Sequence, residues 1–220
     1  MYKAILLFHV AAGTLALGSG LVAIFAAKGQ QNHNRSGRIY ELSMYAVALS
    51  AILLTLLKFN PFLLSIGIFA GYLTFTGKRA LFYYRLRETY IPGLQDKLPA
   101  VAGFFTGLFM ISFPAWQMVT TGTLFVPVLA VFGLSLTGSS FGDLATFRKP
   151  ELFEPRNKIW LLKHIGMMGG AYIATVTAFL VNNVHIQQQW LVWIGPSVIG
   201  GLLIARATNK WRTKLKLRTA

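Results

Sequence analysis

Long apolar segments without charged residues alternate along the chain with shorter segments rich in Lys and Arg. Residues 4–27 form one apolar run, and residues 42–57 and 59–77 form two more. The runs 98–142 and 164–205 are each about twice as long as a single membrane crossing, which takes about 20 residues. Each of these two runs is therefore expected to contain two helices.

The pattern predicts an all-α membrane protein, a bundle of seven transmembrane helices in one integral membrane domain over residues 1–220. Polar turns are expected at 120–122 and 182–189, within the two long runs. The third helix is also expected to continue past the membrane as a basic amphipathic extension over residues 79–89. The predicted helices are residues 3–27, 39–58, 59–79, 98–118, 122–142, 159–182 and 189–207.

Basic residues divide very unevenly between the two sides of this predicted bundle. Of the 21 Lys and Arg residues, only Lys3 and Lys58 fall on one side. Cytoplasmic segments of membrane proteins collect Lys and Arg, whereas short external loops do not. The N-terminus is therefore expected outside, and the C-terminus in the cytoplasm, in a multi-pass protein of the bacterial inner membrane.

A net charge of +15 would also suit a nucleic-acid-binding protein. Here the basic residues flank helices and form no single stripe, so we expect the lipid bilayer as partner and no nucleic acid. Anionic lipid is expected at the basic C-terminal tail, residues 206–218. The chain has no Cys and no phosphate-binding loop, zinc pair or nucleophile elbow. Enzymatic activity is therefore not favoured, although it stays open.

Small residues spaced four apart mark the faces on which membrane helices approach closely. The first helix carries Ala12, Ala16 and Gly20 in this way, and residues 166, 170, 174 and 178 are Gly or Ala on the sixth. Both helices are expected near the centre of the bundle.

Histidine within a membrane span is costly and tends to face a bundle interior. His9 shares a face with the small residues of the first helix, and His164 precedes Met168 by one turn. Imidazole and thioether groups suit haem b or copper, whereas a structural hydrogen bond or a packing role is the simpler interpretation. His9 and His164 lie roughly 18 Å apart in depth, at 1.5 Å per residue, so they cannot share one ion.

Paired sites would therefore need His185 beside His9 and His33 beside His164. The candidate cofactor ligands are His9, His33, His164, His185 and Met168.

The cytoplasmic ends of the second, third, fifth and sixth helices gather charges of both signs. A structural network is the simplest interpretation, and a site for a substrate or a lipid headgroup is the alternative, because Arg suits phosphate and carboxylate groups. The predicted polar cluster consists of Arg35, Arg38, Glu41, Lys78, Arg79, Asp143 and His164.

Three segments carry a resemblance to a known family: 33–40 (HNRSGRIY), 76–81 (TGKRAL) and the stretch from 163 to 179. Together with Asp143 and Phe147-Arg148, they resemble an uncharacterised bacterial membrane family, domain of unknown function 2306 (DUF2306). The resemblance covers most of the chain and implies no reaction. It implies polar sites at His9, His33, Arg38, Arg79, Asp143 and His164.

Two functional hypotheses follow from these observations. In the first, inward-facing His, Arg and Asp residues form a polar site that binds haem or a metal for electron transfer. In the second, the chain is a non-catalytic structural or accessory subunit of a larger membrane complex. A small transporter ranks behind both, because discontinuous helices are not evident.

Overall fold

The computed structural model describes residues 1–121, 127–155 and 157–217, and all regular structure in these ranges is helical. The first three helices are α1 (Tyr2–Phe25), α2 (Gln31–Leu57) and α3 (Pro61–Tyr84). They are followed by α4 (Leu94–Thr121), α5 (Pro127–Thr146), the short 3₁₀ helix η1 (Pro150–Phe153), α6 (Ile159–Asn183) and α7 (Gln189–Lys214). Within the described ranges, six helices are long and apolar enough to cross a membrane: α1, α2, α4, α5, α6 and α7.

Several helices extend beyond their predicted ranges, most clearly at the start of α2 and at the ends of α3 and α7. α2 begins at Gln31 and not at 39, so that His33, Arg35 and Arg38 lie on its first turns. α3 continues beyond residue 79 as predicted but ends at Tyr84, so only the first part of the extension to 89 forms, and residues 85–93 lead into α4 as turns and irregular chain. The break between α2 and α3 follows from Asn60, whose side chain accepts a hydrogen bond from the Leu63 amide (3.0 Å), and from Pro61 in the first turn.

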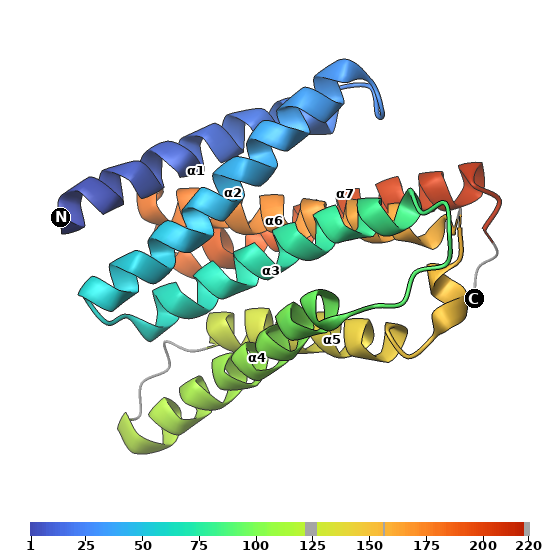
Figure 1. Cartoon of the computed structure of the whole chain (residues 1–220). Coiled ribbons are helices and arrows are strands. Elements are labelled where there is room, and N and C mark those ends of the chain that lie inside the picture. The colour runs from blue at the N-terminus through green and yellow to red at the C-terminus, as the bar shows by residue number, and fades with distance from the viewer. Residues whose placement is uncertain (122–126, 156, 218–220) are drawn as a thin grey trace.

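The helices form three groups that run along a common direction (Figure 1). The hairpin of α1 and α2 lies on one side, the hairpin of α4 and α5 on the other, and α3, α6 and α7 between them. The α1–α2, α3–α4 and α5–α6 connections and the end of α7 lie at one end of the bundle, opposite residue 1. The predicted turn after α6 is confirmed at 184–188. Thr120 and Thr121 of the other predicted turn belong to α4, and Gly122 lies outside the described residues.

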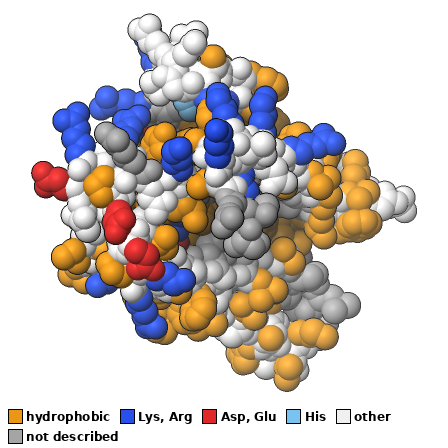
Figure 2. Space-filling model, turned by 90° about the vertical axis from the view of Figure 1, so that its right-hand side faces the viewer, with side chains coloured by type: hydrophobic (Ala, Val, Ile, Leu, Met, Phe, Trp, Pro, Cys, Tyr) orange, Lys and Arg blue, Asp and Glu red, His pale blue; other side chains and the backbone are white. Residues whose placement is uncertain are grey.

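The end of the molecule that carries these three connections is strongly basic. Figure 2 looks onto this end and shows Lys and Arg side chains spread across it, with few Asp or Glu among them. The exposed basic residues of these connections and of the adjoining helix ends are Lys28, Arg35, Arg38, Lys78, Arg85, Arg87, Lys97, Arg148, Lys149 and Lys158.

α3 is the most buried helix of the described chain and the centre of the bundle, with α2, α4, α5 and α6 packed against it. The expectation that α1 would be central is therefore wrong. α1 packs chiefly along α2, although its predicted face is confirmed, because Ala12, Ala16 and Gly20 are its buried residues. A helix surrounded by protein needs no continuous apolar surface, which is consistent with the absence of α3 from the six apolar helices.

A close helix contact joins α4 to α5 through glycine. A Cβ at Gly107 would lie 2.4 Å from Thr137 Oγ1 and 2.7 Å from the Thr137 amide nitrogen, and one at Gly103 would lie 2.5 Å from Ser140 Oγ. The predicted small-residue face of α6 is only partly used, since a Cβ at Gly166 would meet open space and Ala178 is exposed. The spacing Gly103-x-x-x-Gly107 was the sequence signal for the tighter contact.

Candidate functional site: a buried charge network

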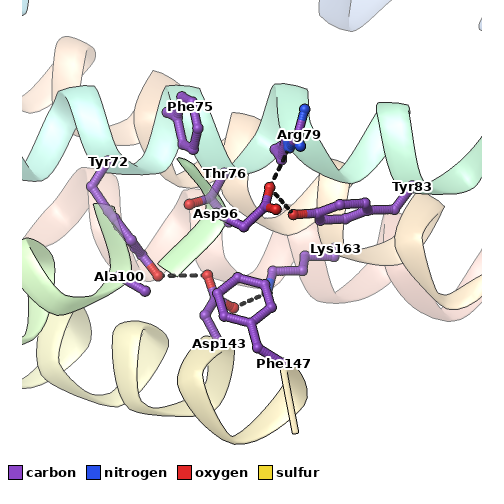
Figure 3. Close-up of a pocket in the computed structure, with 10 residues that line it drawn as sticks. All are labelled: Tyr72, Phe75, Thr76, Arg79, Tyr83, Asp96, Ala100, Asp143, Phe147 and Lys163. Carbon is purple, nitrogen blue, oxygen red and sulfur yellow. Dashed lines mark hydrogen bonds and ion pairs between the residues drawn. The ribbon is translucent and has the colours of Figure 1, made fainter. Parts of the chain in front are cut away.

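One face of α3 supplies most of the polar groups of the candidate site. Tyr72, Thr76, Arg79 and Tyr83 are separated by four, three and four residues, so they line up along the same side of the helix. This side faces the first turn of α4, the last turns of α5 and the start of α6. Figure 3 shows the side chains that meet there.

Asp96, in the first turn of α4, is almost completely buried, with 2% of its surface exposed. Its Oδ1 accepts hydrogen bonds from Arg79 Nε (2.5 Å) and from the Tyr83 hydroxyl (2.6 Å). Its Oδ2 accepts from the Tyr90 hydroxyl (2.7 Å) and from the Gly93 amide (2.9 Å). Four donors and a helix N-terminus stabilise this carboxylate in its ionised form.

Arg79 is held on its other side by aromatic rings. The guanidinium lies 4.2 Å from the centre of the Phe82 ring and donates from a terminal nitrogen to the Tyr90 hydroxyl at 2.7 Å. Phe153 of η1 and Trp160 of α6 pack on Tyr83, with the Tyr83 and Trp160 ring centres 4.6 Å apart. These rings join the α3–α4 and α5–α6 connections beside the ion pair, so they fix the Arg79 side chain in place.

Asp143, near the end of α5, forms the second half of the network and is 3% exposed. It is ion-paired with Lys163 in the first turns of α6 and accepts a hydrogen bond from the Tyr72 hydroxyl at 2.6 Å. The two acidic residues, two basic residues and two tyrosines help to line a small, partly open cavity of about 10 Å³, the room that a single water molecule needs (Figure 3).

The two ion pairs differ in chemistry although both are buried. A guanidinium cannot lose its proton in a protein, so the Arg79–Asp96 pair is permanently charged. A Lys ammonium can transfer its proton to a neighbouring carboxylate, which leaves a neutral amine and a neutral acid. Among the described residues of this network, Asp143 and Lys163 are therefore the pair that can change its charge state.

The predicted polar cluster only partly coincides with this network. Arg79 and Asp143 belong to it, whereas Lys78 pairs with Glu41 (2.5 Å) on the more exposed neighbouring surface. Arg35 and Arg38 are exposed on the first turns of α2. Sequence reasoning missed Asp96, Lys163 and the tyrosines, because each of them meets its partner on a different segment of the chain.

The candidate cofactor ligands do not form one cluster, although His164 and Met168 both contact Gly77 of α3. His9 Nδ1 shares a hydrogen bond with Ser50 Oγ of α2 at 2.8 Å, and His185 is exposed in the α6–α7 connection. Met168 packs against Gly77, where an added Cβ would lie 2.8 Å from the thioether sulfur. These contacts match the simpler interpretation of a hydrogen-bonded histidine and a packed methionine.

His33 and His164 are both hydrogen-bonded to backbone carbonyls at the basic end of the bundle. His33 Nδ1 donates to the Ala23 carbonyl (2.9 Å) and His164 Nδ1 donates to the Gly77 carbonyl (2.8 Å), because a carbonyl can only accept. In the described part of the chain, no group of three or more His, Asp or Glu side chains is placed to hold a metal ion. Haem or metal binding by these residues gains no support from this arrangement and stays a prediction.

Comparisons of the chain with protein-family models, with curated proteins and with solved structures gave no match. The resemblance to DUF2306 is thus neither supported nor contradicted, and function has to be inferred from the site itself.

Proposed function

We propose that the chain is a seven-span protein of the bacterial inner membrane, with its N-terminus outside and its C-terminus in the cytoplasm. The six apolar helices and the uneven distribution of Lys and Arg support this topology. α3 would be the remaining crossing, since it has 24 residues and runs alongside the other helices (Figure 1).

The topology can be tested with single cysteines, because the natural chain contains none. Lys3→Cys and Lys58→Cys are expected to react with a membrane-impermeant maleimide added to intact spheroplasts. Lys216→Cys is expected to react only after the membrane is permeabilised. Labelling of Lys3→Cys and Lys216→Cys from the same side would refute an odd number of crossings.

Within this bundle, we propose that Asp143 and Lys163 form a proton-exchanging site that serves a proton-coupled function. The observation that carries the proposal is a titratable ion pair buried beside a permanently charged one, around a cavity the size of one water molecule. Ionisable residues inside a membrane bundle are costly and commonly mark proton or ion pathways. The Tyr72 hydroxyl donates a hydrogen bond to Asp143 and can do so in either protonation state of the carboxyl group.

Infrared difference spectroscopy of the protein in nanodiscs tests this role. On acidification, the wild-type protein is expected to gain the carbonyl band of a buried carboxylic acid. The band should be absent from Asp143→Asn and retained in Asp96→Asn, whose carboxylate is held charged by Arg79. An unchanged carbonyl band in Asp143→Asn would refute the proposal.

A non-catalytic accessory subunit of a larger membrane complex is a second candidate. The observation that favours it is the exposure of α7. Among the described residues of this helix, Val192 is the one that is buried. Such a helix can face lipid or another protein. Extraction in mild detergent would show a co-purifying protein if this role is correct, and a stable lone monomer if it is not.

The haem or metal hypothesis has its own direct test. A protein purified from membranes that binds haem b shows a Soret band, and one that binds copper shows the metal by elemental analysis. A colourless, metal-free and folded protein would exclude electron transfer by His9, His33, His164, His185 or Met168.

A further inference from the structure

A second cavity lies at the opposite end of the bundle from the charge network. It is bounded by the start of α3, the last turns of α4, and the starts of α5 and α7, and its volume is about 220 Å³. Its described lining is apolar and aromatic apart from one amide. The residues that define its character are Phe62, Phe113, Pro114, Gln117, Leu129 and Trp193.

The walls of this cavity are fixed by packing. Phe62 and Trp193 meet edge to face with ring centres 5.7 Å apart, and Phe113 stacks on Phe109 at 5.2 Å. Pro114 and Leu129 are buried. The wall is therefore part of the helix contacts and does not depend on a single mobile side chain.

The size and chemistry of the cavity decide what can fill it. An apolar cavity of about 150 Å³ in a protein core stays dry and binds benzene, because water finds no hydrogen-bonding partners there. A larger apolar space left empty would forfeit the dispersion contacts of its whole lining. Flat rings fit best, since aromatic walls offer edge-to-face and stacked contacts to a further ring.

The mouth of the cavity lies at the level expected for the outer lipid–water boundary. Trp116 and Trp190, on the same ends of α4 and α7, are 61% and 59% exposed, as is usual for interfacial anchors. Gln117 and Trp193 add an amide and an indole N–H to the lining. A molecule that enters from the outer leaflet can therefore bury a ring and still satisfy a hydrogen-bond acceptor.

We propose that this cavity binds a membrane-soluble molecule with one compact ring and a carbonyl-type hydrogen-bond acceptor. Gln117 would donate to the acceptor, while Phe62, Phe113 and Trp193 enclose the ring. The site is independent of the proton-exchanging pair, so either proposal can fail without the other.

Quenching of tryptophan fluorescence by a brominated ring tests the site in nanodiscs. With 4-bromoacetophenone, the wild-type protein is expected to show a saturable decrease on top of the linear decrease caused by partition into lipid. The saturable part should vanish in Trp193→Phe and persist in Trp190→Phe, the matched control at the exposed neighbouring position. A purely linear decrease, or equal loss in both variants, would overturn the proposal.

Two further variants distinguish the contribution of the ring to binding from that of the hydrogen-bond acceptor. Leu129→Phe places a ring in the cavity, so it is expected to abolish saturable quenching while the melting temperature stays the same or rises. Gln117→Leu is expected to weaken 4-bromoacetophenone about fivefold to tenfold, the size of one hydrogen bond, and to leave bromobenzene unchanged. Equal effects on both compounds would contradict the assigned role of Gln117.

Lipid brominated in its acyl chains supplies the remaining control. If a ring compound is the occupant, 4-bromoacetophenone should compete with this lipid and lower its quenching of Trp193. The lipid could instead quench Trp193 strongly, with no relief when 4-bromoacetophenone is added. That result would identify an acyl chain as the occupant and refute the proposal.

Discussion

Adjacent residues of α3 make ion pairs of very different value. Arg79 lies against Asp96, whose side chain is 0% exposed, whereas the Lys78 side chain is 50% exposed in its pair with Glu41. Removing one partner of a buried pair leaves an uncompensated charge, but an exposed pair loses little because water replaces it. The position of a charge relative to the bundle, and not its type, sets its contribution to stability.

Arg79→Ala is therefore expected to lower the free energy of unfolding by about 3–5 kcal/mol. Lys78→Ala, the matched control one residue earlier, is expected to lower it by about 1 kcal/mol or less. Thermal unfolding of both variants in the same detergent measures the difference. Similar losses in the two would mean that the buried network does not stabilise this end of the bundle.

The tyrosine hydroxyls offer a second comparison between single atoms. The Tyr72 hydroxyl donates to Asp143, whereas the buried Tyr40 hydroxyl lies near Thr175 without meeting hydrogen-bond geometry among the described residues. Tyr72→Phe is expected to cost about 1.5–3 kcal/mol, as for a hydrogen bond to a charged group, and Tyr40→Phe about zero. Unfolding in detergent checks both, and a larger loss for Tyr40→Phe would contradict the hydrogen-bond assignment.

At the scale of helices, the α4–α5 contact depends on the missing side chain of Gly107. A Cβ there would collide with backbone as well as side-chain atoms of Thr137, so the two helices would have to separate. Gly107→Ala is expected to destabilise the protein by about 1–3 kcal/mol. The measurement is again thermal unfolding, with retention of the monomeric elution volume as evidence of folding.

Gly138 on α5 is the matched control, because an added Cβ there would meet nothing within 4 Å. Gly138→Ala is expected to be neutral or to stabilise the helix by up to about 1 kcal/mol, as alanine favours helix more than glycine. A loss of stability in Gly138→Ala would show that α4 and α5 do not pack through the Gly107 face.

The helix pattern was predictable from the sequence, whereas the neighbours of each helix were not. Charge-free runs identified the apolar helices, because that signal is local. The central place of α3 was missed, since burial by protein and burial by lipid give similar composition. The same ambiguity hid Asp96 and Lys163, whose partners lie 17 and 20 residues away in sequence, on other helices.

At the scale of the whole molecule, the basic end has a consequence for lipid composition. Lys210, Lys214 and Lys216 are exposed at the end of α7, which lies at the same end of the bundle as the charged connections (Figure 1). A basic residue next to a negatively charged leaflet contributes about 1 kcal/mol of attraction, which salt screens within a Debye length. These three residues are therefore expected to enrich anionic lipid around the end of the bundle that the proposed topology places in the cytoplasm.

Replacing the three lysines with Gln is expected to reduce the ratio of anionic to zwitterionic lipid that co-purifies with the protein. Native mass spectrometry measures this ratio, and raising the salt concentration during extraction should have the same effect on the wild-type protein. Lys3→Gln with Lys58→Gln is the control, because in the proposed topology these residues lie at the opposite end and face the leaflet with less anionic lipid. An equal reduction in the control would show that total charge governs lipid binding, and that the one-sided distribution of Lys and Arg does not.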